Sequence, residues 1–84
     1  MPISMPMMQR SGKFRCGDQL LSCKWIDAET LQVRLVHPPR PEILTLEQGD
    51  ILRGGNQIVR VSVFLPTTGR LVRGGVVKTE YISG

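Results

Sequence analysis

The C-terminal half of the chain carries a run of cations with no acidic residue among them. Between Asp50 and Glu80 there are five basic residues and no carboxylate; the five are Arg53, Arg60, Arg70, Arg73 and Lys78. A surface of this kind attracts phosphate, nucleic acid, an anionic membrane or an acidic protein. Most cations of the chain are arginines, whose planar guanidinium binds phosphate or carboxylate in a bidentate way. Arginine is also common in proteins from GC-rich genomes, so this bias alone does not establish an anion site.

A second group of cations surrounds an aromatic residue near the N terminus. The segment 10–15, RSGKFR, places Arg10, Lys13 and Arg15 around Phe14. A flexible, glycine-containing segment of this composition could fold over a phosphorylated ligand while the ring stacks on it. We therefore expect these four residues to contact an anion or nucleotide, the alternative being a loop with solvated charges.

Residue types that serve catalysis or metal binding are scarce. The single histidine, His37, adjoins two prolines in a segment predicted to be exposed. Cys16 and Cys23 do not provide the four ligands of a structural zinc site. The glycine pairs at 54–55 and 74–75 lie between predicted strands and lack the Lys-Ser/Thr of a phosphate-binding loop. The sequence thus predicts a protein that is not an enzyme and uses no metal or cofactor.

Length and composition indicate one small domain. A chain of 84 residues buries only about 60–65% of its unfolded surface, so a homodimer would add stability. The N-terminal residues do not have the pattern of a signal peptide, and no run reaches the roughly 18 apolar residues of a membrane span. We expect a cytoplasmic protein without a membrane span.

Cys23 lies in an apolar alternation typical of a buried free thiol, although a disulfide with Cys16 across a tight hairpin is an alternative.

Alternating apolar residues predict β-strands along most of the chain. Residues 21–25 and 31–35 alternate apolar with polar side chains on either side of a turn at 27–29, which indicates a hairpin. Trp25 falls on the apolar face, where filling the core is its commoner role. Residues 59–65 form the strongest strand pattern, with Arg60 and Phe64 on the face opposite the valines.

The partner or nucleic-acid face predicted from this pattern comprises Arg60, Phe64, Arg70, Arg73 and Lys78. A turn at 66–69 leads into returning strands through residue 82, with Gly74-Gly75 suited to a bulge or barrel corner. The segment 45–48 has the spacing of a capping box and predicts one helical turn. Together these elements predict a mostly-β fold, a small single-domain antiparallel β-barrel of five to seven short strands with at most one helical turn. The barrel domain covers residues 10–84, and the methionine- and proline-rich residues 1–9 form a flexible arm.

Three segments resemble the second half of PilZ domains. They are Gln48-Gly49-Asp50-Ile51-Leu52, Val61-Ser62-Val63-Phe64-Leu65-Pro66 and Gly69-Arg70-Leu71-Val72-Arg73-Gly74-Gly75-Val76-Val77. The resemblance implies a six-stranded barrel that binds cyclic di-GMP or a partner protein. It places Arg10 and Arg15 near the family's Arg-x-x-x-Arg motif, one residue too far apart, and Asp27 at the start of the Asp/Asn-x-Ser-x-x-Gly motif. Because Glu29 and Gln32 depart from that second motif, the resemblance favours a protein-binding member over a nucleotide receptor.

The same stretch is similar to the surface-presentation-of-antigens modules of flagellar and secretion switch complexes, which form intertwined β dimers. They share the Gly-Asp-Ile-Leu turn at 49–52 and the Gly-x-Leu-Val-x-Gly strand at 69–74. We expect a non-catalytic binding or adaptor module that contacts an anionic ligand or an acidic protein. The alternatives are a dimeric assembly module and a single-stranded nucleic-acid binder. For the latter, Phe64 is the only ring on the arginine face, where two or three are usual.

Overall fold

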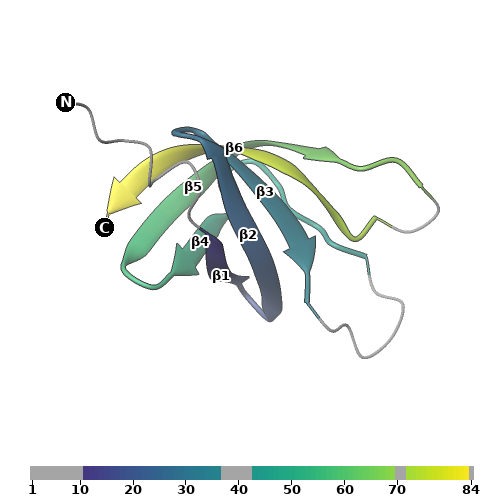
Figure 1. Ribbon diagram of the computed structural model, residues 1–84, viewed down its shortest axis with the longest axis horizontal. Coiled ribbons are helices and arrows are strands. Elements are labelled where there is room, and N and C mark those ends of the chain that lie inside the picture. Colours follow the sequence, from purple (N-terminus) through teal and green to yellow (C-terminus); the bar gives the residue numbers. More distant parts are fainter. Residues whose placement is uncertain (1–10, 37–42, 70–71, 84) are drawn as a thin grey trace.

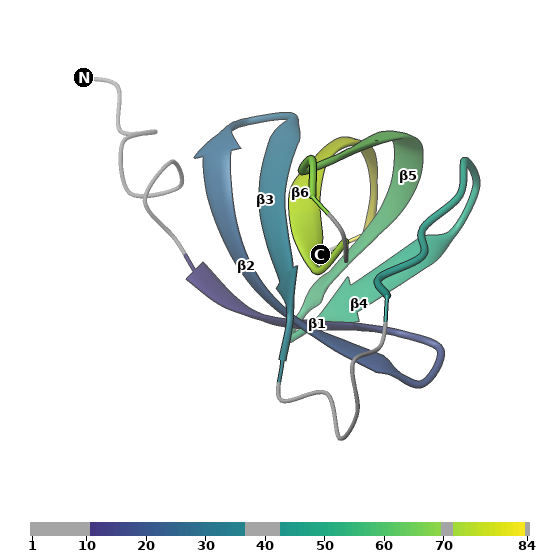
Figure 2. The same ribbon diagram turned by 90° about the vertical axis from the view of Figure 1, so that its right-hand side faces the viewer.

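The computed structural model describes residues 11–36, 43–69 and 72–83. These residues form six strands: β1 (Ser11–Cys16), β2 (Gln19–Asp27), β3 (Thr30–Leu35), β4 (Ile51–Gly54), β5 (Gln57–Pro66) and β6 (Gly74–Ser83). The strands close into an antiparallel barrel in the order β1-β2-β3-β6-β5-β4, as Figures 1 and 2 show. The predicted small antiparallel β-barrel is confirmed. The described residues contain no helix long and apolar enough to cross a membrane.

The barrel interior is filled by the inward-facing residues of every strand. β2 contributes Leu21, Cys23 and Trp25, as the alternation predicts, and β3 contributes Leu31, Val33 and Leu35. The remaining members of the core are Phe14, Leu44, Leu46, Leu52, Val59, Val61 and Val77. Burying a large apolar side chain contributes about 1.5–3 kcal/mol, so this cluster is the main source of stability.

The segment that precedes β4 is extended, in contrast to the predicted helical turn at 45–48. The main chain of Thr45 exchanges hydrogen bonds with the Gln19 side chain at 3.0 and 3.2 Å, while Leu44 and Leu46 enter the core. The Asp50 carboxylate accepts the Glu47 amide at 2.9 Å in a tight turn. The capping-box prediction was wrong because Leu44 and Leu46 alternate into the core at the spacing of an extended chain.

The strand register shifts at three places in the described ladders, and these shifts help to set which side chains face outward. The β2–β3 register shifts between Trp25 and Asp27, so that Trp25 pairs with Leu31 and Asp27 with Thr30. The β5–β6 register shifts between Ile58 and Val59 and again between Val61 and Val63. After this shift Phe64 packs against the core, whereas Val63 and Leu65 are 43% and 56% exposed. The predicted placement of Phe64 on the face of Arg60 was therefore wrong, because an extra residue in the bulge exchanges the two faces of a strand.

Gly74 and Gly75 let β6 pass close to both of its neighbours. A Cβ on Gly74 would lie 2.7 Å from the Val33 carbonyl oxygen, and one on Gly75 would lie 2.8 Å from the Phe64 ring. Both glycines are buried. The close approach of β6 to β3 and β5, rather than a bulge at the pair, explains why both residues are glycines. The end of β5 and the start of β6 project beyond the rest of the barrel (Figure 1).

Candidate functional site: a basic groove on the outer face

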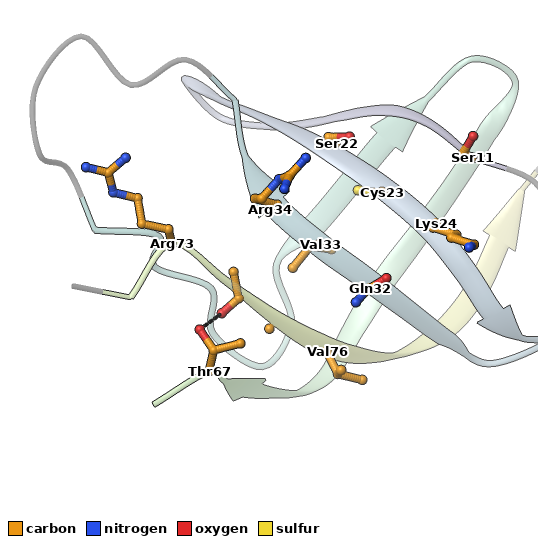
Figure 3. A pocket seen from close by; sticks show the side chains of 12 residues that line it. Ser11, Ser22, Cys23, Lys24, Gln32, Val33, Arg34, Thr67, Arg73 and Val76 are labelled. Atoms are coloured by element: carbon orange, nitrogen blue, oxygen red, sulfur yellow. Dashed lines mark hydrogen bonds between the residues drawn. The ribbon is translucent and has the colours of Figure 1, made fainter. Parts of the chain in front are cut away.

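One hollow of the described surface lies on the outside of the barrel. It has a volume of about 510 Å³ and is lined by residues of β2 and β3, by Ser11 of β1, by Thr67 after β5, and by Arg73 with the start of β6. Its cations are Lys24, Arg34 and Arg73, and no carboxylate lines it. We call this feature the basic groove (Figure 3).

Strand register explains how the cations of the basic groove come together. Arg34 lies directly opposite Ser22, and Lys24 directly opposite Gln32. Lys24 and Arg34 are therefore diagonal neighbours on one face of the hairpin, a relationship that places Cβ atoms about 7–8 Å apart. Arg34 also pairs with Gly74, which follows Arg73. In Figure 3 Arg34 lies between Arg73 at one end and Lys24 at the other.

Glycine and hydroxyl groups shape the rest of the groove. Gly74 and Gly75 present no side chain, so the main chain forms part of the wall. Thr67 is fixed at the edge because both its amide, at 2.9 Å, and its hydroxyl, at 3.1 Å, donate to the Gly74 carbonyl oxygen. Ser22 and Gln32 add polar groups between the cations. Donors of this kind can bind an oxyanion alongside guanidinium and ammonium groups.

The N-terminal cluster predicted to bind a ligand is part of the barrel. Residues 11–16 form β1 rather than a flexible loop. Lys13 and Arg15 point outward and are exposed, whereas Phe14 is 5% exposed and packs edge-on against Trp25 with ring centroids 6.4 Å apart. The prediction of a stacking role for Phe14 conflicts with this burial, because a ring in the core has no free face. Arg10 lies outside the described residues.

Asp27 is distant from Arg15 on β1. Arg15 pairs with Leu20, which lies seven residues before Asp27 on β2. Because a strand rises about 3.3 Å per residue, Leu20 and Asp27 are roughly 23 Å apart along the strand. The carboxylate of Asp27 accepts the Glu29 amide at 2.9 Å. This bond, followed by that with the Thr30 hydroxyl, lowers the pKa of Asp27. The residue stabilises the β2–β3 turn.

The cations predicted on β5 and β6 have different surroundings in the structure. Arg60 lies opposite Glu80, and their side chains form an ion pair at 3.5 Å, so this cation is not remote from a carboxylate as the sequence suggested. The ammonium group of Lys78 donates to the buried Thr30 hydroxyl at 2.9 Å. Arg73 lies in the basic groove instead. Arg70 is outside the described residues.

Lys24 and Arg34 were not predicted as site residues. Both occupy outward positions of the 21–25 and 31–35 alternations, so their exposure could be read from the sequence. Their adjacency could not, because it depends on the bulge between Trp25 and Asp27.

The two thiols are unbonded. Cys23 pairs with Gly12 and Cys16 with Gln19, so they lie at different levels of the β1–β2 ladder. Burial raises the pKa of Cys23 to about 12, and burial with the nearby Asp50 charge raises the pKa of Cys16. Within 11–36, 43–69 and 72–83, no group of three or more histidine, cysteine or acidic side chains is positioned to hold a metal ion.

The chain matches no protein-family model, and neither its sequence nor its fold has a match among the curated proteins and the solved structures that were compared.

Proposed function

We propose that this protein is a non-catalytic binding module that holds an anionic ligand, or an acidic segment of a partner protein, in the basic groove. The observation that carries the proposal is the set of three cations, Lys24, Arg34 and Arg73, in one hollow without a carboxylate. Cations gathered in a concave surface concentrate the positive potential there and attract anions.

The outward face of β1 extends this positive region. Lys13 lies directly opposite Ser22, which lies opposite Arg34 on β3. Lys13, Lys24 and Arg34 are all exposed. The described outward residues on β1, β2 and β3 up to the β2–β3 turn include no acidic side chain, whereas Asp27 and Glu29 lie at the turn itself. An anion in the groove would therefore meet cations on two sides.

The position of the aromatic residues favours recognition of charge over recognition of bases. Phe14 and Trp25 belong to the core, and Phe64 packs against it. No aromatic side chain lines the groove. Proteins that bind single strands generally add stacked rings to their cations, so the nucleic-acid alternative receives less support than a phosphate or carboxylate ligand.

A binding role rather than catalysis is supported by the chemistry of the groove lining. The lining contains no histidine and no carboxylate that could act as a general base. Its thiol, Cys23, has a pKa of about 12 because it is buried, so the reactive thiolate is almost absent near neutral pH. The six-stranded barrel also has the strand number implied by the PilZ resemblance, which supports a ligand-binding or adaptor role.

The experiment that tests the proposal is a chemical-shift titration of the ¹⁵N-labelled protein with three anionic probes. The probes are cyclic di-GMP, a short glutamate-rich peptide and a short single-stranded RNA, each at the same moderate salt concentration. We expect saturable shifts at amides of 22–24, 32–34 and 73–76 with at least one probe. Saturation with the dinucleotide alone identifies a nucleotide receptor, and saturation with the peptide alone identifies a protein adaptor. Absence of saturable shifts with all three would overturn the proposal.

A dimeric assembly module is the second candidate, favoured by apolar side chains on the projecting part of β5. Val63 and Leu65 occupy the same outward face, and Leu65 pairs with the half-buried Val76. An exposed apolar patch of this kind often marks a protein contact. Light scattering coupled to size exclusion should then give twice the chain mass, and Leu65→Lys should return it to the monomer mass. A wild-type protein that stays monomeric at high concentration would contradict the candidate.

A further inference from the structure

A second candidate site lies where β1 and β4 close the barrel. β1 and β4 meet through one registered pair in the described structure, Arg15 opposite Arg53, whereas β1 and β2 share six. Figure 2 shows β4 beside β1 at this seam. The two residues that close the barrel therefore carry the same charge.

Strand geometry places the two guanidinium groups on the same side of the seam. Directly opposed residues of an antiparallel pair point to the same face and have Cβ atoms about 4.5–5.5 Å apart. Both arginines are exposed, and both line a hollow of about 370 Å³ with Gly17, Gly54 and Gly55. This hollow shares no lining residue with the basic groove.

No carboxylate lies directly opposite either arginine in the strand ladders, and the acidic residue nearest in sequence to Arg15, Asp18, lies in the exposed turn after Gly17. Arg15 is flanked by Leu20 on β2, and Arg53 by Ile58 on β5. Two residues before Arg15 comes another cation, Lys13. In the described residues neither arginine forms an ion pair with a carboxylate. The nearby Asp50 influences the thiol of Cys16, and its carboxylate is engaged by the Glu47 amide.

Like charges directly opposite one another destabilise an antiparallel pair. Two guanidinium groups on one face can instead share a tetrahedral oxyanion, since each offers a planar fork of donors to phosphate oxygens. The glycines around the pair leave the hollow open, because they add no side chain. We infer that Arg15 and Arg53 form a phosphate-binding site across the β1–β4 seam, and that a bound phosphate group stabilises the closed barrel.

This site is separate from the basic groove and does not depend on the proposed function. Its ligand is a phosphate group, either the free ion or a phosphomonoester. Because the ligand bridges two strands that are otherwise weakly connected, its binding is linked to the stability of the fold.

The test is thermal unfolding in inorganic phosphate and in chloride of equal ionic strength, for the wild type and for Arg15→Gln, Arg53→Gln and Arg60→Gln. In about 50 mM phosphate the wild-type Tm should rise by roughly 4 °C or more relative to chloride. Arg15→Gln and Arg53→Gln should lose most of this rise, while their Tm in chloride stays equal to or above that of the wild type because the repulsion is relieved. Arg60→Gln, which removes the same charge from β5, should keep the rise.

A second readout locates the ion. In an NMR titration, inorganic phosphate should shift the amide signals of residues 15–17 and 53–55 in the wild type. A parallel titration with glycerol 3-phosphate shows whether the site also accepts a phosphate ester. Rises of equal size in all four proteins would mean general stabilisation by phosphate and would overturn the inference. Shifts confined to the basic groove would overturn it as well.

Discussion

Phe14 and Trp25 meet edge to face inside the barrel, with ring centroids 6.4 Å apart and ring planes at 80°. Both are 5% exposed. The indole N–H of Trp25 donates to the Gln57 side chain at 3.3 Å, so the aromatic pair connects β1 and β2 with β5. Phe14, the ring predicted to stack on a ligand, thus belongs to the core.

Replacing Phe14 should affect stability and leave groove binding unchanged. Phe14→Ala should lower the free energy of unfolding by about 3–5 kcal/mol, because it removes a buried ring and leaves a cavity. The milder Phe14→Leu and Trp25→Phe, combined in a double-mutant cycle, should show a coupling of about 0.5–1.5 kcal/mol. Urea unfolding followed by circular dichroism measures both. If Phe14→Ala weakened ligand binding in a protein of unchanged stability, a stacking role would be indicated instead.

Gly75 should not tolerate a methyl group, whereas Gly12 should. A Cβ on Gly75 would lie 2.8 Å from the Phe64 ring and 2.8 Å from the Pro66 Cα, while a Cβ on Gly12 meets nothing within 4 Å. Gly75→Ala should therefore destabilise the protein by about 1–3 kcal/mol through overpacking. Gly12→Ala on β1 should be neutral or stabilise by up to about 1 kcal/mol. Equal Tm values for the two variants would contradict the close approach of β5 and β6.

The buried thiol of Cys23 predicts a loss of stability at alkaline pH. Burial raises its pKa from 9.0 to about 12, so the folded state holds the proton more tightly than the unfolded state. The resulting stability is fully present below pH 9.0 and is lost as the pH rises through about 12, at no more than about 1.4 kcal/mol per pH unit.

The difference between wild type and Cys23→Ala isolates this effect from the other groups that titrate in the same range. The unfolding free energy of the variant should fall less steeply above pH 9.0 than that of the wild type. In addition, a thiol reagent at neutral pH should modify the half-buried Cys16 before Cys23. Parallel pH profiles would show that Cys23 is more accessible than the structure indicates.

Asp27 should contribute to stability in the acid range. Its pKa is lowered from 3.8, first by the Glu29 amide and then by the Thr30 hydroxyl, so the folded state favours the charged form. That contribution is present above pH 3.8 and is lost as the pH falls through the lowered value. The Tm advantage of wild type over Asp27→Asn should shrink between about pH 5 and about pH 2. A Tm difference that stays constant over this pH range would contradict a stabilising role for the Asp27 carboxylate.

Apolar periodicity was sufficient to predict the barrel, but not which cations share a surface. The alternations at 21–25 and 31–35 correctly placed Leu21, Cys23 and Trp25 in the core. By contrast, a bulge near Ser62 moved Phe64 from the predicted face to the core side. Because a bulge shifts the register by one residue, every outward neighbour beyond it changes.

Two features of β1 were hidden in the sequence for a different reason. The segment Ser11–Cys16 has one large apolar residue, Phe14, between cations, so it resembles a charged loop more than a strand. Its membership of the barrel comes from pairing with β2 along its whole length. The opposition of Arg15 and Arg53 follows from closure between strands that are distant in sequence, which local patterns do not encode.

The most direct test of the basic groove compares two substitutions that each remove one arginine charge, one inside the groove and one outside it. The quantity measured is the affinity for whichever anionic probe shows saturable binding. Isothermal titration at one salt concentration should show at least a tenfold loss of affinity for Arg34→Gln, since a charge-assisted contact is worth about 1.5–3 kcal/mol. Arg60→Gln, whose cation is paired with Glu80 outside the groove, should change the affinity less than about twofold, as a screened surface charge does. Equal losses for the two variants, or an unchanged affinity for Arg34→Gln, would contradict the account.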